Sequence, residues 1–215
     1  MASARKPALK SSKSGNREET QALILSAAEQ VFAEFGYKGA TTGRIAELAG
    51  VPKANLHYYF KTKENLYHQV LEDIVNTWFA AAAEFDSIED PEEAISHYVR
   101  LKLRLSRERP LGSKVFANEI IHGAPNLIGY LRTTLKDWTD AKARVIEQWI
   151  AQGRIRPVDP HHLLVMIWAT TQTYADFGVQ VAAVLGKDDL EDADFETAAE
   201  TLTRIILRGL LAGAD

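Results

Sequence analysis

Apolar side chains recur at every third or fourth position along most of this chain, which is the spacing that lets an α-helix bury one face. No stretch shows the strict alternation of apolar and polar residues that is typical of a half-buried strand. The pattern therefore predicts an all-α protein. Its first helix is expected from Arg17 to Phe35, and Gly36 is expected to end it.

Helix caps, glycines and prolines divide the rest of the chain. Asp90-Pro91 and Asp159-Pro160 each pair an N-cap residue with a proline suited to a first helical turn, and Gly50, Gly123 and Gly186 follow apolar runs. Three short helices followed by six mostly longer ones are predicted. The helices after the first are expected at residues 42–49, 53–60, 63–84, 91–109, 113–122, 126–153, 160–184 and 195–211.

The segment from residue 41 to residue 60 carries the clearest functional signal. Two helices of about seven residues meet there at a tight turn around Gly50, and helices this short need support from neighbouring helices. A small core between them is expected from Ile45, Leu48, Val51, Leu56 and Phe60. This arrangement leaves the outer face of the second of the two helices free to enter a DNA major groove, as in a helix-turn-helix protein.

That outer face carries side chains able to contact phosphates and base edges, and Asn55 and Lys53 are expected at the base edges. Lys63 lies at the start of the next helix, where its charge and the backbone N–H groups are expected to clamp a phosphate. An ordinary helical hairpin with a solvated polar face is the alternative. The candidate DNA-binding residues are Thr41, Thr42, Arg44, Lys53, Ala54, Asn55, His57, Tyr58, Tyr59 and Lys63.

Charge is distributed unevenly along the 215 residues, whose formal net charge is −4. Residues 1–67 contain ten Lys or Arg and six Asp or Glu, whereas the remainder contains fifteen and twenty-three. A basic N-terminal part favours a polyanionic partner at that end, although chance scatter is an alternative. We expect a disordered basic arm at residues 1–16, a DNA-binding domain at 17–62 and a ligand-binding and dimerisation domain at 63–215.

Composition narrows the class of protein. The chain lacks cysteine, which excludes disulfides and thiolate metal sites, and no apolar run is long enough to span a bilayer. Its first residues lack the apolar core of a signal peptide, so a cytoplasmic location without a membrane partner is expected. An enzyme is the rival class, but no nucleophile–base motif, metal motif or phosphate-binding loop occurs. No cofactor and no metal are expected.

The block from Thr41 to Leu66, with its exit sequence Phe60-Lys-Thr-Lys63-Glu64-Asn-Leu66, resembles the TetR family of bacterial repressors. The resemblance implies a three-helix DNA reader and a six-helix regulatory domain. It also implies a homodimer in which the last two helices of each subunit form a four-helix interface, with Leu202, Ile205, Ile206, Gly209 and Leu210 as candidate contacts. The family often has Tyr at the position of His57, which shifts the expected phosphate contact to Tyr58 or weakens it.

Three later segments resemble the pyrimidine-utilisation (Rut) subfamily. They are the run Tyr98-Val-Arg-Leu-Lys-Leu, the turn Gly123-Ala-Pro125, and the segment from Asp159 to Phe177. The resemblance implies a uracil-like pyrimidine effector that controls binding to a double-stranded operator; an unrelated nitrogenous or amphipathic effector is the alternative.

The residues support an effector site of this kind independently. Trp168 and Gln172 lie one helical turn apart, so one face offers a ring for stacking and an amide that both donates and accepts hydrogen bonds. Each aromatic residue is equally compatible with a core position, and Gln172 with a backbone contact. The candidate ligand-binding residues are Trp78, Phe116, Asn118, Trp168 and Gln172.

Overall fold

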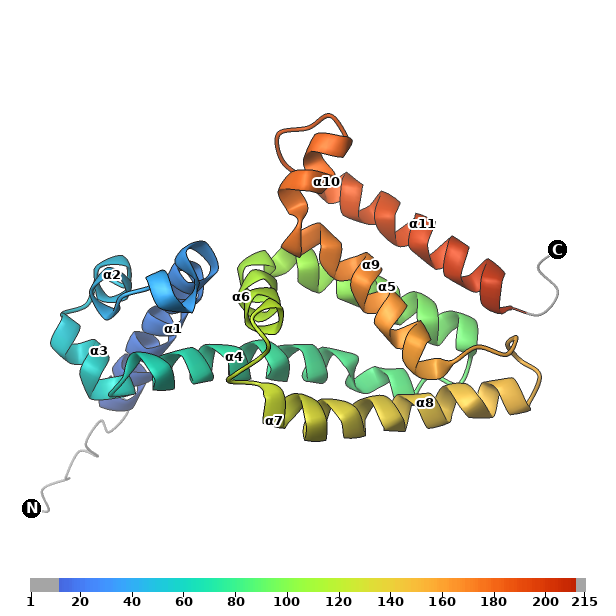
Figure 1. Cartoon of the computed structure of the whole chain (residues 1–215), viewed down its shortest axis with the longest axis horizontal. Coiled ribbons are helices and arrows are strands. Elements are labelled where there is room, and N and C mark those ends of the chain that lie inside the picture. Colours follow the sequence, from blue (N-terminus) through green and yellow to red (C-terminus); the bar gives the residue numbers. More distant parts are fainter. Residues whose placement is uncertain (1–11, 212–215) are drawn as a thin grey trace, which may run out of the picture. The chain divides into compact units, whose positions relative to one another are not determined.

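The computed structural model describes residues 12–211 as helices joined by short turns (Figure 1). Within this range the extended pairing is limited to one isolated bridge between Ile155 and Leu211, and the predicted all-α fold is confirmed. The α-helices are α1 (Ser12–Gly39), α2 (Thr42–Leu48), α3 (Lys53–Phe60), α4 (Lys63–Ala81), α5 (Pro91–Glu108), α6 (Pro110–Ile121), α7 (Ile128–Tyr130), α8 (Lys136–Ala151), α9 (Pro160–Asp176), α10 (Gly178–Val184) and α11 (Asp192–Leu210).

Several helix boundaries differ from those predicted. Helix α1 begins at Ser12 rather than at Arg17, while residues 1–11 of the expected basic arm lie outside the described residues. Gly36 leaves helical geometry at φ 65° and ψ 173°, so the helix is interrupted where its end was predicted, and helical residues follow to Gly39. Helix α4 ends at Ala81 and passes into a 3-10 turn over Ala82–Asp86, short of the expected residue 84.

Two of the later predicted helices are interrupted. The run expected at residues 126–153 is α7 and α8 joined by a π-helical turn over Leu131–Leu135. The run expected at 160–184 breaks at Phe177, whose φ of −120° and ψ of 31° separate α9 from α10. Helical periodicity continues through both interruptions, which explains why the sequence pattern did not reveal them.

The chain divides into two compact units after Val70, so that the first turns of α4 belong to the first unit. Helices α1, α2, α3 and the start of α4 share a small core in the first unit. The ring of Phe32 contacts that of Tyr67 edge-on at 4.8 Å between centroids. Ile45, Leu56 and Phe60 are buried as predicted, but Leu48 is 48% exposed and does not join them.

The second unit is organised around α5. Helices α9 and α11 both pack against α5, and α8 packs against α9 (Figure 1). Capping side chains set where these helices begin: Asp90 accepts a hydrogen bond from the Glu93 backbone N–H at 3.0 Å, and Asp159 accepts one from His162 N–H at 2.9 Å. Both are the Asp-Pro sites that the sequence predicted.

Candidate DNA-binding and effector sites

Helices α2 and α3 hold the candidate DNA-binding residues. Gly50 adopts a φ of 66° between the two helices, a left-handed conformation that glycine adopts without steric cost. The hydroxyl oxygen of Thr41 accepts a hydrogen bond from the Arg44 backbone N–H at 3.2 Å and so caps α2, which leaves the hydroxyl hydrogen available to another acceptor. Buried Leu56 and Phe60 anchor α3 and orient its opposite face outward.

The outward face of α3 is polar and exposed. Lys53, Ala54, Asn55 and His57 are exposed, and Tyr58 is 70% exposed with its ring 5.2 Å from that of half-buried Tyr59. No side chain caps the N-terminus of α3, where Pro52 precedes the first helical residue. The face therefore offers both side-chain donors and free backbone N–H groups, which is the chemistry that nucleic-acid phosphates require.

Lys63 is the candidate whose surroundings differ most from expectation. Its ammonium donates hydrogen bonds to the carbonyl oxygens of Tyr37 and Ala40 at 2.7 and 3.0 Å, and it lies 4.4 Å from the centroid of the Tyr37 ring. These two carbonyls lie at the end of α1, where a cation complements the helix dipole. Two of its three N–H donors are thus occupied in a structural contact. Arg44 lies with its guanidinium 3.9 Å from the ring centroid of Phe35.

A cavity of about 90 Å³ lies in the second unit, between α4, α5, α6, α8 and α9. A water molecule needs roughly 10–15 Å³ on this measure, so the cavity has room for several waters or for a small ring. Four of the five candidate ligand-binding residues line it: Trp78, Phe116, Trp168 and Gln172. Asn118 also lies on α6 but is not among the lining residues; its carbonyl oxygen accepts a hydrogen bond from the His122 backbone N–H.

Aromatic rings make up most of the cavity wall. The rings of Trp78 and Phe116 meet edge-on at 4.9 Å, and those of Trp138 and Trp168 are 6.3 Å apart. The indole N–H of Trp168 donates a hydrogen bond to the hydroxyl oxygen of Tyr98 at 2.7 Å. The N–H group of Trp168 is therefore already occupied within the protein, and its ring contributes to the wall. Sequence reasoning missed eight lining residues: Val75, Phe79, Ala82, Tyr98, Lys102, Tyr130, Leu135 and Trp138.

Lys102 is the charged residue of the cavity wall. It is only 6% exposed, and its ammonium lies 4.6 Å from the centroid of the Trp78 ring. Burial lowers the pKa of Lys102 from 10.5 to about 8, against a smaller opposing effect of the Asp176 carboxylate. The sequence carries a signal for this residue, because Lys102 interrupts the apolar pair Leu101 and Leu103 one helical turn after Tyr98.

A polar contact between α6 and α9 adjoins this end of the cavity. The hydroxyl of Ser113 donates a hydrogen bond to Asp176 Oδ1 at 2.5 Å. Burial raises the pKa of Asp176, although this hydrogen bond and the charges of Lys102 and Lys114 act in the opposite direction. The cavity is therefore aromatic along most of its wall and polar near Lys102 and Gln172.

The candidate dimer residues on α11 divide into two groups. Ile205 is 62% exposed and Gly209 is exposed, whereas Ile206 and Leu210 are each only 6% exposed and belong to the core of their own subunit. Leu202 is half-buried and packs against the same core. Apolar exposure continues over the neighbouring helices, where six more large side chains are exposed: Val165, Met166, Phe177, Val179, Val184 and Leu185.

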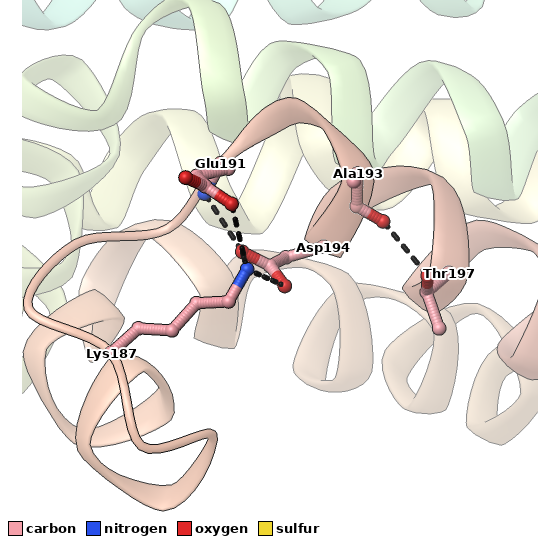
Figure 2. A network of polar contacts seen from close by, with 5 residues as sticks. All are labelled: Lys187, Glu191, Ala193, Asp194 and Thr197. Carbon is pink, nitrogen blue, oxygen red and sulfur yellow. Dashed lines mark hydrogen bonds and ion pairs between the residues drawn. The ribbon is translucent and has the colours of Figure 1, made fainter.

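A polar network orders the corner between α10 and α11 (Figure 2). The ammonium of Lys187 donates hydrogen bonds to Glu191 Oε2 at 2.8 Å and to the two carboxylate oxygens of Asp194 at 2.9 and 3.0 Å. Asp194 also accepts a hydrogen bond from the Glu191 backbone N–H at 2.8 Å, and this bond and Lys187 hold its pKa below the usual range. These contacts fix where α11 begins, beside the exposed apolar residues of α10.

Comparison with known proteins supplies the family. The chain matches the family described as bacterial regulatory proteins, tetR family, over residues 24–70, and the family described as YcdC-like protein, C-terminal region, over residues 71–213. It is 45% identical over 187 residues to the HTH-type transcriptional regulator RutR of Escherichia coli K12, a match that covers 87% of this chain and 88% of the relative. It is 26% identical to the A-factor receptor protein of Streptomyces griseus, over 90% of this chain and 66% of that protein.

Solved structures share the fold at low sequence identity. The ketosteroid transcriptional regulator KstR2 of Mycobacterium tuberculosis is 20% identical with a TM-score of 0.73, over 92% of this chain and 95% of that one. AibR, solved in complex with isovaleryl coenzyme A and operator DNA, is 18% identical with a TM-score of 0.67, over 86% and 97%. Among residues 12–211, no helix is both long and apolar enough to cross a membrane. The chain belongs to the TetR family of bacterial helix-turn-helix transcriptional regulators.

Proposed function

We propose that this chain is a homodimeric repressor whose affinity for operator DNA is controlled by a uracil-like pyrimidine bound in the cavity of the second unit. The observation that carries the proposal is the joint presence of Trp78, Trp168 and Gln172 around one small cavity. The sequence similarity to RutR, together with the resemblance to the pyrimidine-utilisation subfamily, supports the choice of a pyrimidine.

The chemistry of the cavity suits a flat, polar-edged ring. Aromatic faces stack well on a planar heterocycle, and the surrounding rings exclude water from its two sides. The imide edge of uracil alternates carbonyl acceptors with an N–H donor. The carboxamide of Gln172 both accepts and donates, so it can pair with two adjacent atoms of that edge.

DNA binding is assigned to the face of α3. Lys53 and Asn55 reach base edges in the major groove, while Thr42, Arg44 and Tyr58 contact the backbone on either side. The contacts in which Lys63 is engaged argue for a supporting role, and we therefore assign the flanking phosphate contacts to Tyr58 and to the uncapped N-terminus of α3.

Helix α4 is the element through which the effector acts. Its first turns contribute to the core of the first unit through Leu66 and Tyr67, and its later residues Val75 and Trp78 line the cavity. A ligand that binds two arrangements of α4 with different affinity shifts the equilibrium between them, and with it the DNA affinity of the dimer.

The dimer interface is assigned to the exposed apolar side chains of α9, α10 and α11. Seven of the large apolar side chains that are exposed in the described part of the chain lie on or beside these helices, including Val179, Val184 and Ile205. An apolar surface of this extent is typical of an interaction site. The four-helix interface that the family resemblance implies therefore uses Ile205 and Gly209 but not Ile206 or Leu210.

Two measurements on the full-length protein test the proposal. Isothermal calorimetry with uracil, thymine, cytosine and adenine shows whether a pyrimidine binds. Fluorescence anisotropy with labelled genomic fragments, without and with each base, then shows whether binding changes DNA affinity. If the protein binds DNA but gives no heat with any pyrimidine, the assignment of a pyrimidine effector is wrong, while the assignment as a DNA-binding regulator stands.

A larger amphipathic effector is the second candidate. Apart from Lys102 and Gln172, the lining residues are aromatic or aliphatic, a composition that also suits an acyl chain with a polar end. A thermal-shift screen that includes fatty acids and acyl thioesters distinguishes it, because a ligand at 100 times its dissociation constant adds about 2.7 kcal/mol of stability.

A further inference from the structure

Lys102 stands out among the buried polar groups of the second unit because its ammonium makes no hydrogen bond and no ion pair with the residues whose side chains the structure describes. Its one polar contact there is with the ring face of Trp78. A lysine ammonium has three N–H donors, and a buried charge is costly unless it is paired or hydrogen-bonded. The unfilled donors of Lys102 face a cavity that it lines.

The neighbouring carboxylate does not satisfy this charge. Asp176 acts on Lys102 electrostatically, but it lies beyond ion-pair distance and its carboxylate is hydrogen-bonded to Ser113 on α6. Removal from water also lowers the pKa of Lys102, so the charge is present at neutral pH at a cost to the fold. A costly group of this kind at the wall of a cavity is typical of a binding residue.

We propose that Lys102 is the specificity-determining residue of the effector site, and that it selects a planar ring whose edge presents a hydrogen-bond acceptor. The inference rests on the proposed function, since it names what the same cavity requires of its ligand. Lys102 only donates, whereas Gln172 donates and accepts. Together they match a carbonyl next to an imide N–H, as in uracil and thymine.

The same pair of residues disfavours cytosine. An exocyclic amino group replaces one carbonyl of uracil there and the imide N–H is lost, so the edge with the amino group sets N–H donors against Lys102 and only the remaining carbonyl can accept from it. A site built to hydrogen-bond one group discriminates strongly against an analogue that lacks it, because the buried partner is left unpaired. We expect cytosine to bind about tenfold more weakly than uracil, because it loses the imide edge and keeps one carbonyl.

Replacing Lys102 with Met tests the inference, because Met keeps the aliphatic stem and removes the charge. Calorimetry with uracil should show at least a tenfold loss of affinity, while the Tm of the free protein should rise because an uncompensated buried charge is gone. Lys136→Met, which removes an exposed lysine of α8 and its ion pair with Asp140, is the matched control; it should leave uracil affinity unchanged and should not raise the Tm.

The outcomes separate this inference from the proposed function. If uracil binds Lys102→Met as tightly as wild type, the role of Lys102 is overturned and the proposed function stands. The same conclusion follows if weaker binding is accompanied by a lower Tm, because a lower Tm indicates a structural role for Lys102. If wild-type protein binds no pyrimidine, the effector proposal fails, and benzoate and aniline then test Lys102. If wild-type protein binds benzoate more tightly than aniline and Lys102→Met does not, the selection of an acceptor edge by Lys102 is supported. If wild-type protein shows no preference between the two, that selection is overturned.

Discussion

The indole nitrogen of Trp168 donates a 2.7 Å hydrogen bond to the hydroxyl oxygen of Tyr98, and this contact joins α9 to α5 at the wall of the cavity. Tyr98 is only 3% exposed, and burial raises its pKa far above neutrality, so its hydroxyl stays protonated. The bond holds the Trp168 ring in one orientation. An effector that stacks on this ring therefore meets a surface that is already ordered.

Tyr98→Phe tests this pre-organisation. The substitution keeps the aromatic ring but leaves the Trp168 N–H without its acceptor, which should lower the free energy of unfolding by about 1–3 kcal/mol. Effector affinity should fall as well, because Trp168 gains rotamer freedom. Urea unfolding followed by tryptophan fluorescence measures the first effect and calorimetry the second. Unchanged stability together with unchanged affinity would contradict the assigned role.

Gln172→Leu separates ligand contact from packing. The volume is nearly kept while both hydrogen-bonding functions are removed, so uracil should lose about 1–3 kcal/mol of binding free energy for each imide group left unpaired. Stability without ligand should be nearly unchanged, because Gln172 makes no side-chain hydrogen bond with the described residues. Asn118→Ala is the control, since Asn118 does not line the cavity, and calorimetry should find its uracil affinity equal to that of wild type.

Lys63 and Lys53 should respond differently to replacement by Ala. Lys63→Ala removes two hydrogen bonds to the end of α1 and should destabilise the DNA-binding unit by about 1–3 kcal/mol. Lys53→Ala removes an exposed side chain and should weaken DNA binding without loss of stability, with a shallower dependence of affinity on salt. Thermal unfolding and anisotropy titrations at several salt concentrations measure both. Equal stability of the two variants would argue against the structural role of Lys63.

Two adjacent isoleucines on α11 give a matched test of the dimer. Ile205 is exposed, so Ile205→Asp should leave each subunit folded and shift the protein to monomers in analytical ultracentrifugation. Ile206 is buried in its own subunit, so Ile206→Asp places a charge in the core and should unfold or aggregate the protein. An Ile205→Asp variant that remains a dimer at micromolar concentration would move the interface elsewhere.

Local signals in the sequence predicted most of the fold. Asp90, Asp159 and Gly50 act through bonds to residues a few positions away, so their caps and turn could be recognised without knowledge of the packing. Which apolar residues of α11 are buried in their own subunit could not be recognised in this way. Ile205 and Ile206 are adjacent apolar residues, and only the packing of α11 against α5 decides which one is buried. Such choices depend on tertiary contacts.

The candidate effector site shows the same limit. Trp168 and Gln172 were recognised because they share a helix face, which is a local relationship. Tyr98 and Lys102 share a face of α5, but their connection to Trp168 and Trp78 spans 70 and 24 residues of sequence and arises only through packing. The structural contacts of Lys63 were missed for a related reason: its position at a helix start suggested a phosphate contact, and its carbonyl partners lie at the end of another helix.

The pH dependence of stability provides a further test of the buried charge of Lys102. Its pKa is about 8 in the folded protein and 10.5 when it is exposed to water, so between these values the unfolded chain binds more protons than the folded one. The unfolding free energy must then rise with pH across this window, by up to about 3 kcal/mol. Below pH 8 both states are protonated, and this contribution is flat.

Subtracting the unfolding free energy of the Lys102→Met variant from that of wild type isolates the contribution of Lys102 from that of all other titrating groups. The unfolding free energy of wild type minus that of Lys102→Met, measured in urea at pH 7, 8, 9 and 10, should be most negative at pH 7 and approach zero as pH rises. Three charged or ionisable neighbours do not obscure the window: Asp176 is a carboxylate throughout it, and the raised pKa values of Tyr98 and Tyr130 keep both phenols neutral. Effector affinity should change in the opposite direction and fall above pH 8, because the ligand pairs with the charged form. A difference in stability that stays constant from pH 7 to 10 would mean that Lys102 reaches water, and the cost that makes it a selective binding residue would be absent.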